Sequence, residues 1–426
     1  MKMNKFFSVD KRLDAIADEV RNELKPIFAE IDETTEYNQQ KMLSAFIKNG
    51  VSESHFAAST GYGYDDRGRE TLERVFADAM GAEDSLIRHN FVSGTHTLTV
   101  ALFGVLRPGD TVLCVTGTPY DTIQFAFGIK DAPGSLKEFG VKYEQIDLKD
   151  ERPDLDAIKT RLEKQPVKMV YIQRSRGYSL RPSLFVSDIE KIVKAVREVD
   201  KKAVIMVDNC YGEFVEKREP LSVGADLIAG SLIKNPGGGI APTGGYIAGR
   251  ADLVELCANR LNAPGVGKEL GATLGHSKEL FMGIFNAPHV TGEALKTAAF
   301  AAGLFSRLGF SVTPTQNEKR ADIIQVVRLE REDALIAFCK GMQKGAPVDS
   351  FVTPEPSDMP GYDCKVIMAA GAFHLGASIE LSSDAPLREP FAVWMQGGLN
   401  FHSAGMGVLL AAQSCLEQGV FTLDDK

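Results

Sequence analysis

The chain has 426 residues, a formal net charge of −9 and 25% charged residues, and its lysines and arginines form no dense basic block. This composition argues against nucleic-acid binding. The length predicts one large domain and a smaller one, each with its own hydrophobic core.

Export and membrane insertion are not expected either. The N-terminal sequence MKMNKFFSVDKRLDAIADEV has two adjacent aromatic residues before charge returns, which is too short for the apolar core of a signal peptide. No run of about eighteen apolar residues predicts a membrane span. The six cysteines form no CxxC pair, which favours reduced thiols. We therefore expect a cytoplasmic protein without a membrane partner.

The N-terminal segment predicts an amphipathic helix. Apolar residues from Leu13 to Ile31 recur every three or four positions and share one helical face. We expect a helical arm over residues 1–60 that packs on another element or on a partner subunit.

From about residue 85, short apolar runs rich in β-branched residues alternate with helical stretches. Strands that are apolar throughout and joined by helices are typical of a mostly parallel sheet covered on both faces. We predict a large α/β domain over residues 61–285. Its expected strands are DTVLCVTG, KYEQIDL, VKMVYIQ, AVIMVDN, ADLIAG and GGYIAG, and its expected helices include GTHTLTVALFGVLR, DLDAIKTRLEK and VSDIEKIVKAVREV.

After about residue 285 the pattern changes. An alanine-rich helix, GEALKTAAFAAGLFSRLG, leads into the expected strands ADIIQVVRL, CKVIMAAGAF and GASIELS and then a helix in HSAGMGVLLAAQSCLEQG. This order predicts a smaller C-terminal α+β domain over residues 286–426.

Three common cofactor classes lack their motifs. Ligands of open α/β sheets bind at the carboxyl ends of the strands. No strand there is followed by the G-x-G-x-x-G of a nicotinamide fold, and PGVGKEL lacks the upstream glycine and the hydroxyl residue of a P-loop. The seven histidines have no paired spacing, so no metal site is expected.

A phosphate site is predicted where Ser93, Gly94 and Thr95 begin a helix in FVSGTHTLTVALFGVL. Free backbone N–H groups and the helix dipole favour an anion there. A plain N-cap explains Ser93 or Thr95 equally well.

Two further candidates follow strands. Asp208 ends the apolar strand of AVIMVDNCYGEF, where a carboxylate could hold a cationic ring nitrogen, although a strand-end aspartate also caps turns. Tyr120 follows a strand and a proline in TGTPYDT, where its ring could lie on a ligand ring or pack in the core.

The strongest candidate is Lys234, which lies between the strand ADLIAGS and a glycine-rich run in GSLIKNPGGGIAPTGGYIAG. Glycines there allow close approach of the backbone to a ligand. An amine desolvated at this point would have a lowered pKa and would attack an aldehyde. The alternative is a surface lysine in a flexible loop.

The order of these features resembles the large-domain layout of pyridoxal-phosphate enzymes of the aspartate-aminotransferase fold, also called fold type I. More narrowly, several segments are similar to the methionine γ-lyase-like group, also labelled aluminium resistance proteins. The likeness runs from about residue 35 to the C-terminus. Its segments are SGTH, GTPYDT, QRSRGYS, VDNCYGEF, SLIKNPGGGIAPTGGYIAG, MPGYDCKVIMAAGAFHLGASIELSSDAPLREPF and WMQGGLNFHSAG.

This resemblance implies a role for each candidate. Lys234 would bind the aldehyde of pyridoxal 5′-phosphate and later move the substrate Cα proton as acid and base. Asp208 would keep the ring nitrogen protonated, and Tyr120 would stack on the ring. Either Ser175 or Arg176 would lie near the ring hydroxyl.

The resemblance also implies a phosphate site. The backbone at Ser93, Gly94 and Thr95 would hold the phosphate together with the Ser231 hydroxyl. The better-characterised γ-lyases have S-x-T-K before the lysine, whereas this chain has isoleucine in place of the threonine, so one hydroxyl is lost.

Three more residues are assigned through the resemblance. Tyr64 and Arg67 in GYGYDDRGRETLE are loose counterparts of a Y-x-R segment that reaches the phosphate of a neighbouring subunit, at one residue more than the expected spacing. Arg388 in DAPLREPF would bind the substrate carboxylate through two hydrogen bonds. Its alternative is an ion pair with Glu389 or another surface acid.

These expectations lead to a pyridoxal-phosphate carbon–sulfur lyase that eliminates a thiol from the β or γ carbon of methionine, cysteine or cystathionine. The alternatives are an aminotransferase, a racemase or an aldol-type lyase on the same fold, and a cofactor-binding regulatory protein. The resemblance also implies a homodimer or homotetramer with shared active sites.

Overall fold

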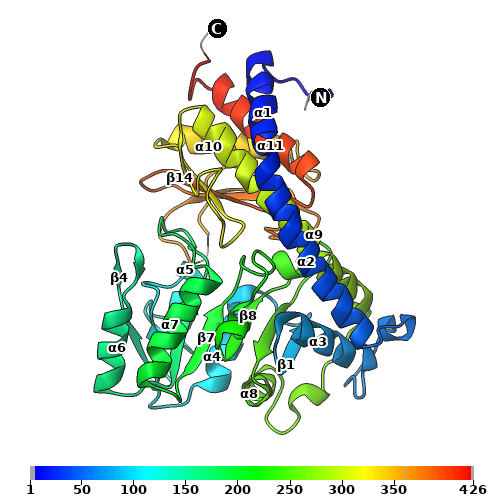
Figure 1. Cartoon of the computed structure of the whole chain (residues 1–426), viewed down its shortest axis with the longest axis vertical. Helices are drawn as coiled ribbons and strands as arrows, with labels where there is room; N and C mark the ends of the chain where they lie inside the picture. The colour runs from blue at the N-terminus through cyan, green and yellow to red at the C-terminus, as the bar shows by residue number, and fades with distance from the viewer. Residues whose placement is uncertain (1–4, 360, 424–426) are drawn as a thin grey trace. The chain divides into compact units, whose positions relative to one another are not determined.

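The computed structural model describes residues 5–359 and 361–423 (Figure 1). The chain divides into two units: Tyr37–Ala287, and Met1–Glu36 together with Pro288–Lys426. The segment 1–60, expected as one arm, is thus shared between the two units. Two helices, α2 (Lys25–Lys48) and α9 (Ser277–Arg307), contain the points at which the chain passes from one unit to the other.

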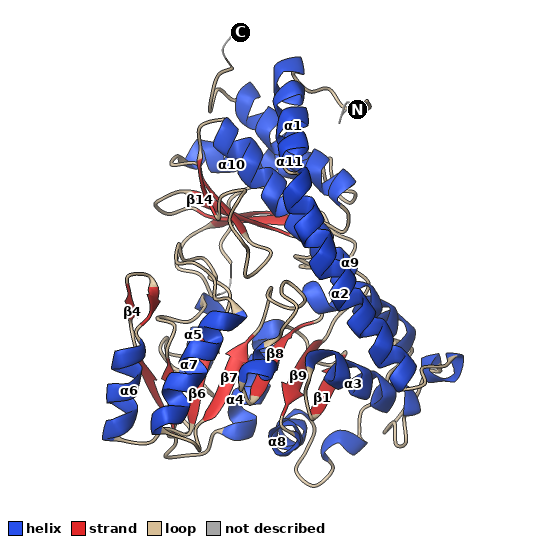
Figure 2. Cartoon of the chain, viewed as in Figure 1, coloured by secondary structure: helices blue, strands red, loops and turns tan. Residues whose placement is uncertain are grey.

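The unit Tyr37–Ala287 is built on a seven-stranded sheet of order β1-β9-β8-β7-β6-β2-β3 (Figure 2). The strands β3, β2, β6, β7 and β8 are parallel, and β9 is antiparallel to both of its neighbours. The strands are β1 (Asp84–Arg88), β2 (Thr111–Cys114), β3 (Lys142–Gln145), β6 (Met169–Gln173), β7 (Val204–Asp208), β8 (Leu227–Ser231) and β9 (Gly245–Gly249). The mostly parallel sheet of the sequence analysis is confirmed.

Helices cover both faces of this sheet because its central strands are apolar on both sides. On β6, Val170 and Ile172 contribute to one hydrophobic cluster, and Met169 and Tyr171 contribute to the other. The first cluster includes side chains of α3 (Arg67–Met80), α6 (Leu155–Lys164) and α7 (Val186–Val199). The second includes side chains of α4 (Gly94–Val105), α5 (Asp121–Phe127) and α8 (Ala251–Leu261).

Short elements complete this unit. Four 3₁₀ turns cover Glu53–Phe56, Pro220–Val223, Asn235–Gly237 and Gly267–Glu269, and a small ribbon pairs β4 (Leu148–Lys149) with β5 (Arg152–Pro153). The turn Asn235–Gly237 follows the candidate lysine directly.

The other unit has a five-stranded antiparallel sheet of order β10-β11-β14-β13-β12. Its hydrophobic cluster joins the sheet to α1 (Lys11–Glu23), α10 (Glu332–Lys344) and α11 (Phe401–Glu417). Its strands are β10 (Ser311–Thr313), β11 (Gln325–Arg328), β12 (Val366–Ala369), β13 (Ser382–Pro386) and β14 (Ala392–Gln396). Among the described helices, none is long and apolar enough to span a bilayer.

Two predicted elements differ from the structure. The helix expected from Leu13 to Ile31 is two helices that meet at Leu24, because Pro26 near the start of α2 lacks an N–H and cannot continue α1. The segment GASIELS is mostly turn, and β13 begins only at its last residue. The Glu380 carboxylate holds that turn by accepting hydrogen bonds from the backbone N–H groups of Phe373 (2.8 Å) and His374 (2.9 Å).

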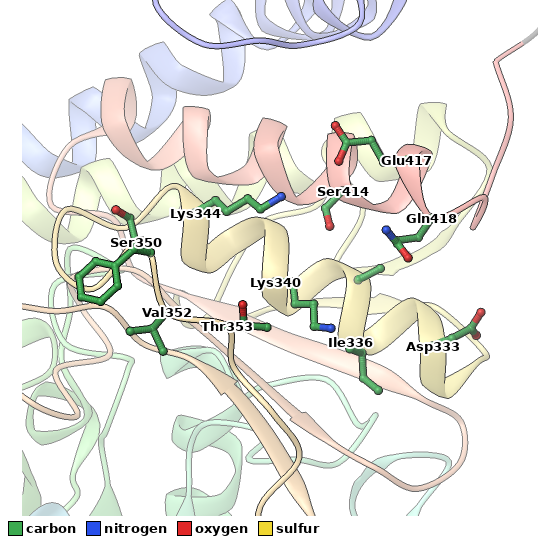
Figure 3. A pocket seen from close by; sticks show the side chains of 12 residues that line it. Asp333, Ile336, Lys340, Lys344, Ser350, Val352, Thr353, Ser414, Glu417 and Gln418 are labelled. Carbon is green, nitrogen blue, oxygen red and sulfur yellow. The ribbon is translucent and has the colours of Figure 1, made fainter.

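A surface pocket of about 380 Å³ opens between α10, the end of α11 and residues 350–353 (Figure 3). Lys340 and Lys344 of α10 line it, together with Asp333 and Glu417. Charges of both signs therefore surround this opening.

The packing of α1 generates a stability prediction. Leu13 is 0% exposed in the cluster around β11 and α10, whereas Ile47 on α2 is 71% exposed. We expect Leu13→Ala to lower the free energy of unfolding by about 2–5 kcal/mol, because it leaves a cavity in a packed core. Ile47→Ala should change it by less than about 0.5 kcal/mol. Urea titration followed by circular dichroism measures both, and equal effects would contradict the burial of α1.

Candidate active site

The candidate lysine lies at the carboxyl edge of the large sheet. Strands β7 and β8 are parallel neighbours, with Asp208 opposite Ala229, so the segments that follow the two strands start side by side. Lys234 comes three residues after β8, and its Nζ lies 4.0 Å from the centre of the Tyr211 ring, which follows β7. The structure thus joins the two sequence segments that carry Lys234 and Asp208.

The lysine loop is fixed by a buried amide. Asn235 is fully buried, and its Nδ2 donates to the backbone oxygens of Tyr211 (3.0 Å) and Glu213 (3.1 Å). Gly237 has no room for a side chain, because a Cβ there would lie 1.7 Å from the oxygen of Leu232. The glycines after Lys234 therefore serve close packing of the backbone.

The charge state of Lys234 differs from the expectation. Burial lowers the pKa of Lys234, but Cys210, Tyr211 and Asp208 together raise it by more, so the net direction is upward. The predicted lowering of this pKa is therefore wrong for the polypeptide by itself. The amine lies over the face of the Tyr211 ring, a position that favours a cation.

Asp208 is 7% exposed at the end of β7. Its Oδ1 accepts a hydrogen bond from the Cys210 N–H at 3.2 Å, and its Oδ2 accepts one from the Tyr171 hydroxyl at 3.4 Å. Burial raises the pKa of Asp208, and the nearby Lys234 partly offsets that rise. The aspartate thus both supports the turn after β7 and provides a buried carboxylate beside the amine.

The start of α4 faces the end of β8. Ser93 is the N-cap, and its Oγ accepts from the His96 N–H at 3.0 Å, while the Thr95 hydroxyl lies 2.8 Å from that of Thr122. These hydroxyls have protein partners, as the N-cap alternative predicted. A Cβ at Gly94 would lie 3.3 Å from the Cβ of Ser231, so the helix start and this serine are in contact.

Ser231 supplies a donor that the protein itself does not use. Its side chain is 1% exposed, and within the described part of the chain its Oγ has no hydrogen-bond partner. A buried hydroxyl without a partner is costly and normally indicates a ligand or an ordered water. Beside the N-terminus of α4, it fits an anionic group.

Tyr120 lies at the start of α5 and is half-buried. Its N–H donates to Oε1 of Gln173 at 2.7 Å, which ties it to the end of β6, and its ring lies 5.5 Å from the Tyr178 ring. Ser175 and Arg176, which also follow β6, are both buried. Arg176 donates from its backbone N and its Nε to the Ser183 hydroxyl at 3.1 and 3.4 Å. The choice between Ser175 and Arg176 stays open.

Three predicted residues have exposed side chains. Tyr64 is 59% exposed, and Arg67 is an exposed residue at the start of α3. Arg388 is exposed after β13 in the other unit, and no acid of the described chain lies within ion-pair distance of it. The alternative, an ion pair of Arg388 with Glu389, is thus not seen.

Two buried polar groups beside the site were missed by sequence reasoning. The Glu213 Oε1 accepts from the Tyr246 hydroxyl at 2.7 Å, and desolvation raises the pKa of Glu213 to about 8. Fully buried Arg174 pairs with Glu216 at 2.8 Å and hydrogen-bonds to the Asn209 side chain at 2.8 Å. The run VDNCYGEF contains Glu213 and Asn209, one member of each group, but nothing in its sequence indicates that Glu213 is buried.

These residues fit a ligand with an anionic group, an aromatic ring and an electrophilic carbon. The helix start and the Ser231 hydroxyl suit the anion, the Asp208 carboxylate suits a ring cation, and the Lys234 amine suits the carbon. Among the described residues, no cluster of metal-ligating side chains occurs.

Comparison with known proteins gives consistent matches over the whole chain. The family model for methionine gamma-lyase matches residues 13–416. A crystal structure from Clostridium acetobutylicum, of a protein with a proposed cystathionine beta-lyase activity and involved in aluminium resistance, has a TM-score of 0.93 and 49% identity. That match covers 95% of this chain and 96% of the other.

Two sequence relatives add to this. An uncharacterised Bacillus subtilis protein, YnbB, is 46% identical over 409 residues, which is 95% of this chain and 97% of that protein. The L-methionine gamma-lyase of Pseudomonas putida is 30% identical over 212 residues, which is 50% of this chain and 47% of that enzyme.

The buried acid next to the site generates a prediction on pH. In the folded chain the pKa of Glu213 is raised to about 8 from its usual 4.5, so between these values the folded state holds a proton that the unfolded state releases. Stability contributed by this group is therefore lost as pH rises through that window. We expect Glu213→Gln to gain stability relative to the parent between pH 6 and about 8.5.

The control is Glu163→Gln, which changes an exposed acid on α6. Urea midpoints at the two pH values measure both variants. If the difference in stability between Glu213→Gln and the parent does not change with pH, Glu213 is not neutral in the folded protein.

Proposed function

Since the chain belongs to the methionine gamma-lyase family and its cofactor is pyridoxal 5′-phosphate, we propose that it is a carbon–sulfur lyase acting on a sulfur amino acid. The family membership confirms the resemblance found in the sequence. The observation that carries the proposal is the half-buried Lys234, whose Nζ lies 4.0 Å from the Tyr211 ring centre and whose charge interacts with the Asp208 carboxylate. Lysines are mostly exposed in proteins, so a half-buried lysine at the carboxyl edge of a parallel sheet needs a chemical reason.

We infer which residues hold the cofactor from the hydrogen-bonding groups that have no partner within the protein. The phosphate is assigned to the backbone at the start of α4, residues 93–95, and to the Ser231 hydroxyl, which otherwise has no partner among the described residues. The ring nitrogen is assigned to Asp208, and the ring face to Tyr120. When bound, pyridoxal phosphate withdraws electrons from the substrate Cα.

The residues of the chain then have distinct tasks. Lys234 would hold the cofactor through Nζ and would act as the acid/base that moves the substrate Cα proton. Tyr211 holds the amine in position through its ring face, and Asn235 fixes the loop that carries the lysine. Asp208 keeps its charge opposite the ring cation, because a carboxylate beside a cation is favoured in its ionised form.

The proposed reaction removes the sulfur substituent. For β elimination, loss of the Cα proton is followed by cleavage of the carbon–sulfur bond at the β carbon. For γ elimination, a Cβ proton is also lost before the bond at the γ carbon breaks. The sulfur leaves as a thiol, or as hydrogen sulfide when the substrate is cysteine. Addition of water then releases a keto acid and ammonia. Methionine, cysteine and cystathionine are the proposed substrates, with their carboxylate bound by Arg388, whose guanidinium has no acid partner in the described chain.

We further propose that the sites are shared in a homodimer or homotetramer. Tyr64 and Arg67 are exposed on the unit that carries Lys234, which suits residues that contact the phosphate of a neighbouring subunit. An exposed tyrosine next to an exposed arginine has contact area available for such an interface.

The cofactor assignment predicts a spectroscopic result. Purified protein should be yellow, and borohydride should bleach the band and leave the cofactor attached to Lys234. Lys234→Ala should lack the bleachable band, whereas Lys201→Ala, at an exposed position, should keep it. Absorbance spectra and peptide mass spectrometry measure this, and a protein that stays colourless with added pyridoxal phosphate would contradict the assignment.

The reaction class predicts products that form without a second substrate. The holoenzyme should release keto acid and ammonia from at least one of methionine, cysteine and cystathionine with no amino acceptor present. Lys234→Ala should lower that rate by at least about a hundredfold, because the proton at Cα loses its acid/base. An absolute need for a keto-acid acceptor would instead identify an aminotransferase, and loss of optical activity without keto acid would identify a racemase.

A further inference from the structure

A second pocket, of about 200 Å³, lies in the unit Tyr37–Ala287 where β1 ends and α9 begins. It shares no lining residue with the group around Lys234. No acidic residue lines it. Its polar lining side chains are Arg69, Arg88, His89, Asn90, Thr273 and Ser277.

Two hydrogen-bond donors of this lining are buried and unused. Arg69 is 2% exposed and Ser277 is 1% exposed, and in the part of the chain that is described neither Nε of Arg69 nor Oγ of Ser277 has a hydrogen-bond partner. Buried donors of native proteins are normally satisfied, so two in one pocket indicate a missing acceptor. The other end of the Arg69 guanidinium is fixed, because it donates to the oxygens of Gly63 (2.6 Å) and Gly271 (2.9 Å).

The charges around the pocket favour one negative charge in it. Arg88 forms a buried ion pair with Glu73 at 2.7 Å, so its charge is already balanced. The only ion pair recorded for Arg69 within the described chain is with Glu70 at 3.7 Å, and the Glu70 side chain is 42% exposed to water. Because the buried Asp66 carboxylate also acts on Arg69, the surroundings of the pocket favour at most one further negative charge.

The helix start adds to this preference. Ser277 is the first residue of α9, and the free N–H groups of a helix N-terminus favour an anion. The apolar part of the lining, which includes Leu274 and Leu280, suits a short aliphatic group. The volume is below the range of about 300–1,000 Å³ that is typical for drug-sized ligands, so the ligand is small.

The pocket on α10 (Figure 3) lacks these properties. Its lysines, Lys340 and Lys344, are accompanied by the acids Asp333 and Glu417, and none of its lining residues carries a buried polar atom without a partner in the described chain. The small pocket beside α9 is therefore the better candidate for a specific ligand.

We propose that the pocket beside α9 binds a small monocarboxylate, with its carboxylate on Arg69 Nε and Ser277 Oγ and its aliphatic part against Leu274 and Leu280. The guanidinium and the hydroxyl supply two directed donors, which is the number that a carboxylate can accept in one orientation. The pocket is a binding site in addition to the one that contains Lys234.

The test is fluorine NMR of the holoenzyme with trifluoroacetate as the monocarboxylate probe. We expect saturable binding with a Kd on the order of millimolar, competed by acetate more strongly than by inorganic phosphate. Ser277→Ala should weaken binding about tenfold, because it removes a hydrogen bond to a charged group. Lys278→Ala, which removes an exposed positive charge at the next position, should leave the Kd within about twofold.

A second variant acts from the exposed rim. Leu274 is 60% exposed in a loop, so Leu274→Asp should fold and should abolish binding by placing a carboxylate beside the ligand. Leu43→Asp, at a 45% exposed position on α2, is the matched control and should bind normally.

Four outcomes would overturn the proposal. The first is the absence of saturable binding, and the second is stronger competition by phosphate than by acetate. The third is binding only after the cofactor has been removed. The fourth is that Arg388→Ala abolishes binding while Ser277→Ala leaves it unchanged. The last two would assign the anion to a cofactor or substrate site.

Discussion

One half-buried amine at the carboxyl edge of a parallel sheet is the centre of the region around Lys234. The groups that interact with this amine are the Tyr211 ring, whose centre lies 4.0 Å from Nζ, and the Asp208 carboxylate. Strand β8 brings the lysine and strand β7 brings both of its partners, which is possible because the two strands are parallel and adjacent. Asn235 closes this arrangement by bonding across the two loops.

The segment after β7 is held by a second buried charge. Arg174 is 0% exposed and is balanced by Glu216 at 2.8 Å and Glu219 at 3.6 Å. A Cβ at Gly212 would lie 2.5 Å from Cδ of Arg174, so the chain passes directly over the guanidinium. The arginine therefore fixes the backbone that carries Tyr211 and Glu213.

Unused hydrogen-bond donors are the feature that separates binding positions from structural ones. At Ser93 and Thr95 only the backbone is a candidate for phosphate contacts, because their hydroxyls are occupied by His96 N and Thr122 Oγ1. Ser231 has no such partner in the described chain, and the same holds for Arg69 Nε and Ser277 Oγ in the pocket beside α9. A buried donor without an acceptor has lost its hydrogen bonds to water and destabilises the folded state. These atoms therefore indicate positions where a bound ligand would supply the missing acceptor.

Much of this protein follows from local sequence patterns. The central strands were predicted because they are apolar throughout, and the proximity of Asp208 and Lys234 followed from the rule that parallel strands end at one edge. Pro26 could have divided the N-terminal helix from sequence alone. Tertiary structure alone decided the direction of the Lys234 pKa, the burial of Glu213 and Arg174, and the unused state of Ser231 and Ser277. The physical reason is that helix and strand periods arise between neighbours in the chain, whereas desolvation, charge balance and hydrogen-bond satisfaction depend on residues far apart in sequence that meet only after folding.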